Sequence, residues 1–101
     1  MQAYIGRGAR CYLAYVDDKP VGTCSLLSLN GCSGIFSVGT LEDCRRQGVG
    51  SALTVRAVRD SVSEGNSIHL LYVDQGEYAE HLYREIGFET DHTIAWFVKA
   101  L

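Results

Sequence analysis

The hydrophobic pattern of this chain changes once, at a glycine-rich turn near its middle, and that change limits the folds it can adopt. Before the turn, three runs rich in Tyr, Val, Leu and Ile occupy residues 11–16, 21–29 and 35–41. They are separated by "DDKP" and "NGCSG", and segments that contain proline or Asn-Gly in this way form tight turns. The first half of the chain therefore predicts three antiparallel strands connected as a meander.

After the turn the pattern becomes helical. Apolar side chains recur every three or four positions between residues 49 and 64, which is the spacing of one apolar helix face. The residues of this face are Ala52, Val55, Val58 and Val62. A short apolar run at 68–73 predicts a buried strand, and residues 77–86 predict a second helix that Gly87 ends. One side of this second helix carries Tyr78, Leu82, Glu85 and Ile86.

The order of these elements predicts the fold class. Residues 88–98 add one or two closing strands around a polar turn, so that strands and helices alternate in the second half. We expect an α/β (α+β) fold with a mixed, mostly antiparallel sheet, a β-α-β crossover and helices on its faces. The 101 residues are enough for one domain and too few for two, so residues 1–101 are predicted to form a single domain.

Charge, cysteine spacing and hydropathy exclude several classes of function. The net charge of −3 argues against nucleic-acid binding, which usually requires a basic excess. No apolar run approaches the length of a membrane span and the first residues lack a signal-peptide core, so a cytoplasmic protein is expected. The cysteines have no CxxC spacing and the histidines do not complete a zinc pattern, so no metal site is predicted. Cys11 and Cys24 lie in apolar runs and are interpreted as small buried residues.

The turn itself, "CRRQGVGSAL" at residues 44–53, combines glycines and arginines at the start of a helix. A helix N-terminus carries unpaired N–H groups and a partial positive charge, and glycine lets the backbone approach an anion closely. With Arg45 and Arg46 beside them, Gly48 and Gly50 predict a pyrophosphate site. A P-loop is excluded because the Lys-Ser/Thr pair is absent, and a dinucleotide fingerprint because Leu53 replaces the third glycine. A glycine-containing turn with solvated arginines remains the alternative.

Two motifs together resemble one enzyme family. The pattern formed by Arg45, Gly48 and Gly50 after a strand is similar to the acetyl-CoA pyrophosphate loop of the GNAT superfamily of N-acetyltransferases. "LYREIGFE" at residues 82–89 resembles the second signature of that family, an aromatic helix end followed by Gly-Phe. The resemblance covers roughly residues 11–98. It implies acetyl-CoA as the cofactor and transfer of its acetyl group to a primary amine of a small molecule or a peptide.

The resemblance also implies roles for individual residues. The strand before the loop would bond the pantetheine arm, and the backbone of the loop would hold the pyrophosphate. The implied cofactor-binding residues are Val38, Gly39, Thr40, Arg45, Arg46, Gln47, Gly48, Val49, Gly50 and Ser51. Tyr83 matches the tyrosine that serves as general acid toward the departing thiolate. A packed helix aromatic is the alternative for Tyr83.

The chain departs from the family pattern at three places. Cys32 stands where many members carry the general base, and Gly76 stands where many carry an asparagine. Other groups that could act as a base through water are Glu42, Asp43, His69 and Asp74. The first ten residues are too few for the strand and two helices that usually precede the hairpin. Without those elements the strand at 11–16 would have an open edge and exposed apolar side chains, which predicts a homodimer.

Three functions from different classes remain open on the sequence. The first is a catalytic acetyltransferase. The second is a non-catalytic acyl-CoA-binding module or a degenerate remnant of such an enzyme. The third is an adenine-nucleotide or phosphate binder unrelated to acyl transfer.

Overall fold

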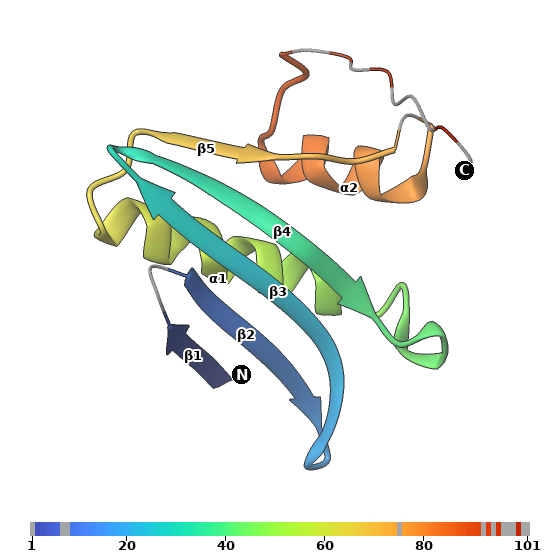
Figure 1. Ribbon diagram of the computed structural model, residues 1–101. Helices are drawn as coiled ribbons and strands as arrows, with labels where there is room; N and C mark the ends of the chain where they lie inside the picture. Colours follow the sequence, from blue (N-terminus) through green and yellow to red (C-terminus); the bar gives the residue numbers. More distant parts are fainter. Residues whose placement is uncertain are drawn as a thin grey trace.

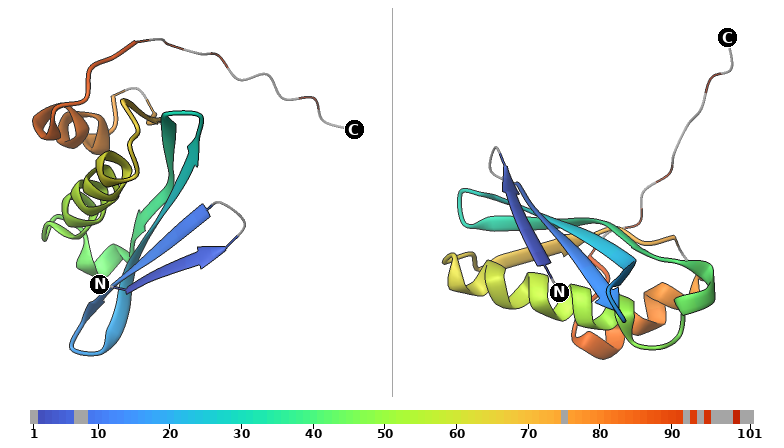
Figure 2. Two further views of the ribbon diagram at one scale, coloured as in Figure 1. Left: turned by 90° about the vertical axis from the view of Figure 1, so that its left-hand side faces the viewer. Right: turned by 90° about the horizontal axis from the view of Figure 1, so that it is seen from below.

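A five-stranded sheet carries two helices on one of its faces (Figures 1 and 2). This computed structural model describes residues 2–6, 9–74, 76–91, 93, 95 and 99. The elements are β1 (Gln2–Gly6), β2 (Ala9–Val16), β3 (Lys19–Leu29), β4 (Cys32–Thr40), the short 3-10 helix η1 (Glu42–Cys44), α1 (Val49–Ser63), β5 (Ile68–Leu71) and α2 (Tyr78–Ile86).

The sheet has the order β1-β2-β3-β4-β5, which follows the order of the chain. The first four strands pair antiparallel, and β5 pairs parallel with β4 after α1 has crossed between them. The expectation of a mixed, mostly antiparallel sheet with one β-α-β crossover is therefore confirmed.

The two hairpin turns have the backbone that their residues favour. Asp17 and Asp18 connect β2 to β3 with φ values of 51° and 63°, and Asn30 and Gly31 connect β3 to β4 with φ values of 51° and 83°. Two-residue turns with both positions in the left-handed region match the twist of the strands they join. Asp, Asn and Gly tolerate that region better than other residues. The first turn is shorter than expected, because β3 already begins at Lys19.

The N-terminal segment forms a strand that the sequence did not predict. β1 pairs with β2 from Gln2 opposite Leu13 to Gly6 opposite Ala9. The prediction that 11–16 would be an open edge strand is therefore wrong, because β2 has partners on both sides. A weakly patterned segment can add to a sheet in this way, since pairing uses its backbone rather than its side chains.

The core lies between the sheet and α1. It consists of Tyr12, Cys24, Leu26, Ile35, Leu53 and Ala57. The Tyr12 hydroxyl donates to Asp60 Oδ2 at 2.6 Å, and Arg10 contacts the same oxygen at 3.0 Å. Burial, reinforced by the hydrogen bond to Asp60, raises the pKa of Tyr12 to about 12. The phenol stays protonated and fastens β2 to α1.

The inward face of α1 differs from the apolar face seen in the sequence. Its buried residues are Leu53, Thr54, Ala57 and Ser61. Ala52 is exposed, and Val62 is 58% exposed. The expectation that the face with Ala52 and Val62 packs on the core is wrong, because two polar residues replace apolar ones on the face that does.

Both buried polar residues of α1 are hydrogen-bonded, which makes their burial possible. Thr54 Oγ1 donates to the Gly50 carbonyl oxygen at 2.8 Å. The Ser61 hydroxyl lies 2.7 Å from the Ser33 hydroxyl and 2.6 Å from His69 Nδ1. These contacts tie α1 to the start of β4 and to β5.

The four cysteines are free thiols. Cys24 is buried as predicted, and burial raises its pKa to about 11. Cys11 is exposed, so its predicted burial is wrong. Successive side chains of a strand point to opposite faces, and the neighbouring Tyr12 occupies the face toward α1.

The last predicted elements are described only in part. α2 buries Tyr83, while Tyr78 and Glu85 are exposed. Residues 88–91 are not in a strand, and the rest of the hairpin predicted at 88–98, with His92, lies almost entirely outside the described residues. Among the helices that the structure describes, none has the length and apolar composition to cross a membrane.

Candidate active site

β4 and β5 run side by side only at their beginnings. Their pairing extends from Cys32 opposite Ile68 to Ile35 opposite Leu71, and beyond these pairs the strands diverge (Figure 1). A bulge in β4 accompanies the divergence: Ser37 has a φ of 54° and, with Val38, stands opposite the single residue Cys24 of β3. Such a bulge bends a strand and increases its twist.

A cavity of about 200 Å³ lies where the two strands separate. Its lining consists of Ile35, Phe36, Ser37, Val38, Leu71, Tyr72 and Tyr83. Two residues singled out in the sequence, Val38 and Tyr83, therefore share one cavity. Within the described chain, β4 has no strand on its β5 side after Ile35. Its N–H groups that point toward the cavity are thus not used by the sheet.

Tyr83 is held firmly in this cavity. Its side chain is 7% exposed, and its ring meets that of Phe88 edge-on with centroids 6.1 Å apart. Burial raises the pKa of Tyr83 and the nearby Cys24 thiol adds to this, while a hydrogen bond with Thr54 lowers it. The phenol is therefore protonated at neutral pH and able to donate a proton.

The N-terminus of α1 is open to an anion. Gly48 is its N-cap residue, with a φ of 84°, and no side chain caps the helix or places a carboxylate in its first turn. The first intrahelical bond runs from the Ala52 N–H to the Gly48 carbonyl oxygen, at 2.9 Å. The N–H groups of residues 49–51 therefore have no partner inside the helix.

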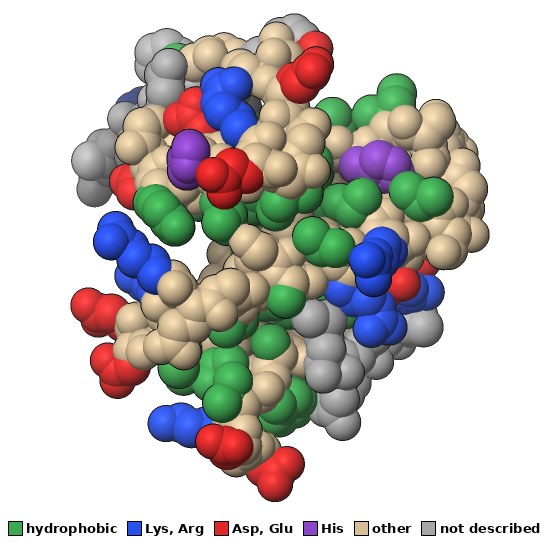
Figure 3. Space-filling view, turned by 180° about the vertical axis from the view of Figure 1, so that it is seen from behind, with side chains coloured by type: hydrophobic (Ala, Val, Ile, Leu, Met, Phe, Trp, Pro, Cys, Tyr) green, Lys and Arg blue, Asp and Glu red, His purple; other side chains and the backbone are tan. Residues whose placement is uncertain are grey.

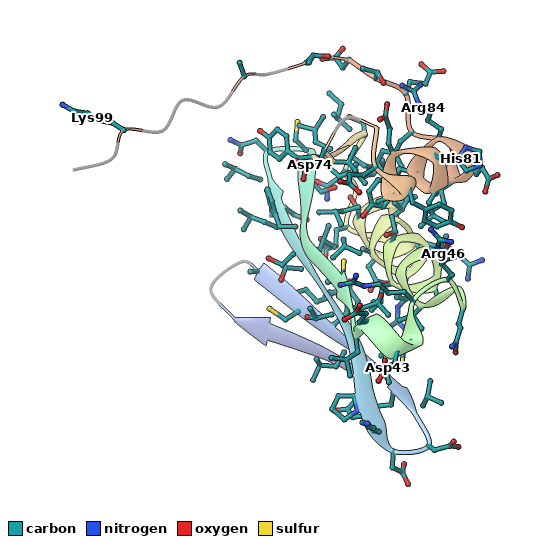
Figure 4. All side chains as sticks on the ribbon, turned by 90° about the vertical axis from the view of Figure 1, so that its right-hand side faces the viewer. Asp43, Arg46, Asp74, His81, Arg84 and Lys99 are labelled. Atoms are coloured by element: carbon teal, nitrogen blue, oxygen red, sulfur yellow. The ribbon has the colours of Figure 1, made fainter. Side chains whose placement is uncertain are left out.

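The side chains of the loop connect it to neighbouring elements. Arg45 Nε donates to the Thr40 carbonyl oxygen at 3.1 Å, which fastens the loop to the end of β4. Arg46, itself left-handed with a φ of 61°, places its guanidinium 4.9 Å from the centre of the Tyr78 ring on α2 (Figure 4). Gln47 Nε2 lies 3.5 Å from the Asp43 carbonyl oxygen. From the helix side, arginines and carboxylates surround this turn next to a hollow in the surface (Figure 3).

The other predicted cofactor residues lie between the loop and the cavity. Val38 is half-buried against the core, while Gly39 is exposed and Thr40 ends β4. A Cβ added at Gly50 would lie 3.9 Å from Thr40 Oγ1 and 4.0 Å from Leu82 Cδ2. The first turn of α1 thus lies next to the end of β4 and to α2.

Thr54 was not singled out in the sequence. Its hydroxyl donates to the Gly50 carbonyl oxygen at 2.8 Å, and it also interacts with the Tyr83 side chain. It therefore connects the loop to the tyrosine. The only signal in the sequence is a threonine one helical turn after Gly50, and that is too general to be recognised.

The structure brings no expected base into the cavity. Glu42 and Asp43 are exposed in η1, and Asp74 is exposed after β5. His69 is engaged with Ser61 on the other side of the Ile35–Leu71 pair. Among the described residues, the cavity lining contains neither a carboxylate nor an imidazole.

The two remaining departures have structural roles. Cys32 starts β4, away from Tyr83. Gly76 adopts a φ of 84° before α2, and its N–H donates to Glu80 Oε2 at 2.7 Å. The turn before α2 requires a left-handed backbone at this position, and glycine adopts that conformation without steric cost.

A family model described as an acetyltransferase (GNAT) domain matches residues 7–90 of the sequence. A search of curated proteins found no match to this sequence.

Several solved structures share the fold. A putative acetyltransferase from Agrobacterium tumefaciens is 24% identical, with a TM-score of 0.79, over 93% of this chain and 71% of that one. An aminoglycoside acetyltransferase from an uncultured soil metagenomic sample, in complex with sisomicin, is 17% identical, with a TM-score of 0.79, over 95% and 68%. Aminoglycoside N-acetyltransferase AAC(6')-Iy, in complex with CoA, is 15% identical, with a TM-score of 0.78, over 95% and 79%. At these identities the likeness shows the fold alone.

Proposed function

Because this chain belongs to the GNAT acetyltransferase family, we propose that it is a cytoplasmic, single-domain N-acetyltransferase that uses acetyl-CoA. Its acceptor would be a primary amine of a small molecule or peptide, which attacks the acetyl group directly. The observation that carries the proposal is the placement of Tyr83 and Val38 in one cavity, beside an uncapped helix N-terminus.

The residues present fit the coenzyme. The loop offers N–H groups of α1 without a capping side chain or a carboxylate, which suits a pyrophosphate. A Cβ at Gly48 would meet no atom within 4 Å, so the backbone is accessible there. Val38, Gly39 and Thr40 lead from this loop toward the cavity and would bond the pantetheine arm through their main chain. CoA complexes are known for a protein of the same fold.

Bound acetyl-CoA supplies a thioester whose carbonyl carbon can form a bond to the amine nitrogen as its bond to sulfur breaks. N–H groups of β4 that face the cavity would donate to the carbonyl oxygen while negative charge develops on it. Tyr83 would give its phenolic proton to the departing thiolate. The amine would lose one proton to solvent and Tyr83 would regain one from solvent, since the described lining has no base.

Acetyl-CoA is expected to raise the melting temperature, because a ligand that binds only the folded state stabilises it by about 2.7 kcal/mol at one hundred times its Kd. Differential scanning fluorimetry with acetyl-CoA, and separately with ATP, measures this. Thiol release with a panel of amines then measures transfer. No shift with acetyl-CoA, or an equal shift with ATP, would contradict the proposal.

A non-catalytic acyl-CoA-binding module is the second candidate. The absence of a carboxylate or imidazole from the described cavity lining favours it. A melting shift with acetyl-CoA that is not accompanied by thiol release with any amine would select this candidate over the enzyme.

We also propose that two copies form a homodimer. β1 is now the edge strand, and its outer backbone groups have no strand partner among the described residues. On β2, beyond the residues that pair with β1, Val16 is 51% exposed. An open edge invites pairing, and a two-fold contact would cover both copies at once. Light scattering at micromolar concentration should report about twice the chain mass, and a monomer under those conditions would refute the dimer.

A further inference from the structure

The sheet face opposite the helices is apolar and open. α1 and α2 both lie on the other face (Figure 2), and side chains of β3 and β4 project away from these helices (Figure 4). The large hydrophobic side chains of this open face are between 40% and 70% exposed. They are Leu27, Leu29, Phe36, Ile68, Leu70 and Tyr72.

All of these side chains except Ile68 line a groove of about 390 Å³ across β3, β4 and β5. This volume lies within the range of small-molecule sites, about 300–1,000 Å³. Within the part of the chain that the structure describes, every residue that lines the groove is uncharged. The groove is thus suited to an apolar body and offers no partner to a cation.

The floor of the groove depends on a glycine. A Cβ at Gly34 would lie 2.5 Å from two outer atoms of the Phe36 ring, so a side chain at residue 34 would turn this ring aside. The absence of that Cβ lets the Phe36 ring lie along the strand. The ring then presents a flat aromatic surface, against which another ring can stack.

The groove continues into the candidate active site. Phe36, Leu71 and Tyr72 line both the groove and the cavity that contains Tyr83. A molecule whose body lies in the groove can therefore place one end beside the tyrosine. Because the groove approaches from the open face, this path is separate from the α1 N-terminus on the helix side.

We infer that the acceptor is a primary amine with an apolar, aromatic body, of the chemical class of 2-phenylethylamine; this rests on the proposed acetyltransferase function. The ring would lie in the groove against Phe36, Leu70 and Tyr72, and the amine would enter the cavity. A polyamine or an aminoglycoside would lose the hydration of several ammonium groups there without gaining a carboxylate, which is costly.

The test measures binding of two amines by isothermal titration calorimetry, with and without coenzyme A. 2-Phenylethylamine is expected to bind with a Kd at least tenfold lower than that of spermidine. Leu70→Asn, which keeps the branched shape of the side chain but makes it polar, should raise the Kd of 2-phenylethylamine about tenfold, while Leu70→Met, which stays apolar, should leave the Kd nearly unchanged. The matched control is Val62→Asn on α1, where the side chain is 58% exposed and outside the groove.

The possible outcomes separate this inference from the proposed function. Equal or tighter binding of spermidine, or no effect of Leu70→Asn, overturns the inference even if acetyl-CoA binds and is used. Failure of acetyl-CoA to bind overturns the proposed acetyltransferase function. The amine titration without coenzyme A still shows whether the groove prefers an aromatic amine. If Leu70→Asn instead halves the mass measured by light scattering and leaves amine binding unchanged, the face is an interface between copies and the inference is wrong.

Discussion

Tyr83→Phe is expected to lower kcat for acetyl transfer roughly 100-fold or more, the usual scale of general acid catalysis, with little change in the affinity for acetyl-CoA. The substitution removes only the hydroxyl. Tyr83 is only 7% exposed, and its ring keeps its edge-on contact with Phe88. The enzyme would lose the proton that the departing thiolate takes, while the surfaces that bind the coenzyme stay in place.

Steady-state kinetics with the best amine found, together with the acetyl-CoA-induced melting shift, measures this prediction. A group used only in the transition state changes kcat and kcat/KM equally. Tyr72→Phe is the comparison, because Tyr72 lines the same cavity but is 69% exposed. Equal losses for the two variants, or unchanged turnover in Tyr83→Phe, would show that Tyr83 has only a packing role.

Gly48→Val should abolish the melting shift produced by acetyl-CoA. Gly48 has a φ of 84°, where a β-branched residue is strained, so the loop would change shape. An added Cβ would also project into the open space at the N-terminus of α1, since no atom lies within 4 Å of it. Both effects act on the backbone N–H groups that are proposed to hold the pyrophosphate.

Gly65→Val is the matched control at the other end of α1. Gly65 has a φ of 88° and equally open space around an added Cβ, so its substitution carries the same backbone strain. Both variants should melt at a lower temperature than the parent, but only Gly48→Val should fail to respond to acetyl-CoA. A normal response in Gly48→Val would remove the loop from the coenzyme site.

Features set by local backbone chemistry could be predicted from the sequence. The turn at Asn30 and Gly31, the N-terminus of α1 at Gly48 and the end of α2 at Gly87 lie where their residue types indicated. Each depends on a few neighbouring residues and on the special conformational freedom of glycine or asparagine. The resemblance to a family gave Val38 a role in binding the coenzyme and Tyr83 a role as general acid, and these two residues line one cavity.

Features set by distant partners could not be predicted in this way. The buried face of α1 includes Ser61 because Ser33 on β4 and His69 on β5 lie opposite it, and Ser33 is 28 residues away in the sequence. β1 could not be recognised because its pairing with β2 uses backbone groups that every residue has. The open groove likewise arises from three strands, and its character depends on which faces the helices leave uncovered.

The contact between Gly34 and Phe36 links two positions of the groove. With the ring in place, a Cβ at residue 34 would lie 2.5 Å from its outer atoms, so a side chain there must turn the ring aside. Because these atoms are the far end of a side chain that is 40% exposed, the ring can move at small cost. A substitution at position 34 therefore acts on the groove through the orientation of Phe36, and the effects of changes at the two positions are not expected to add.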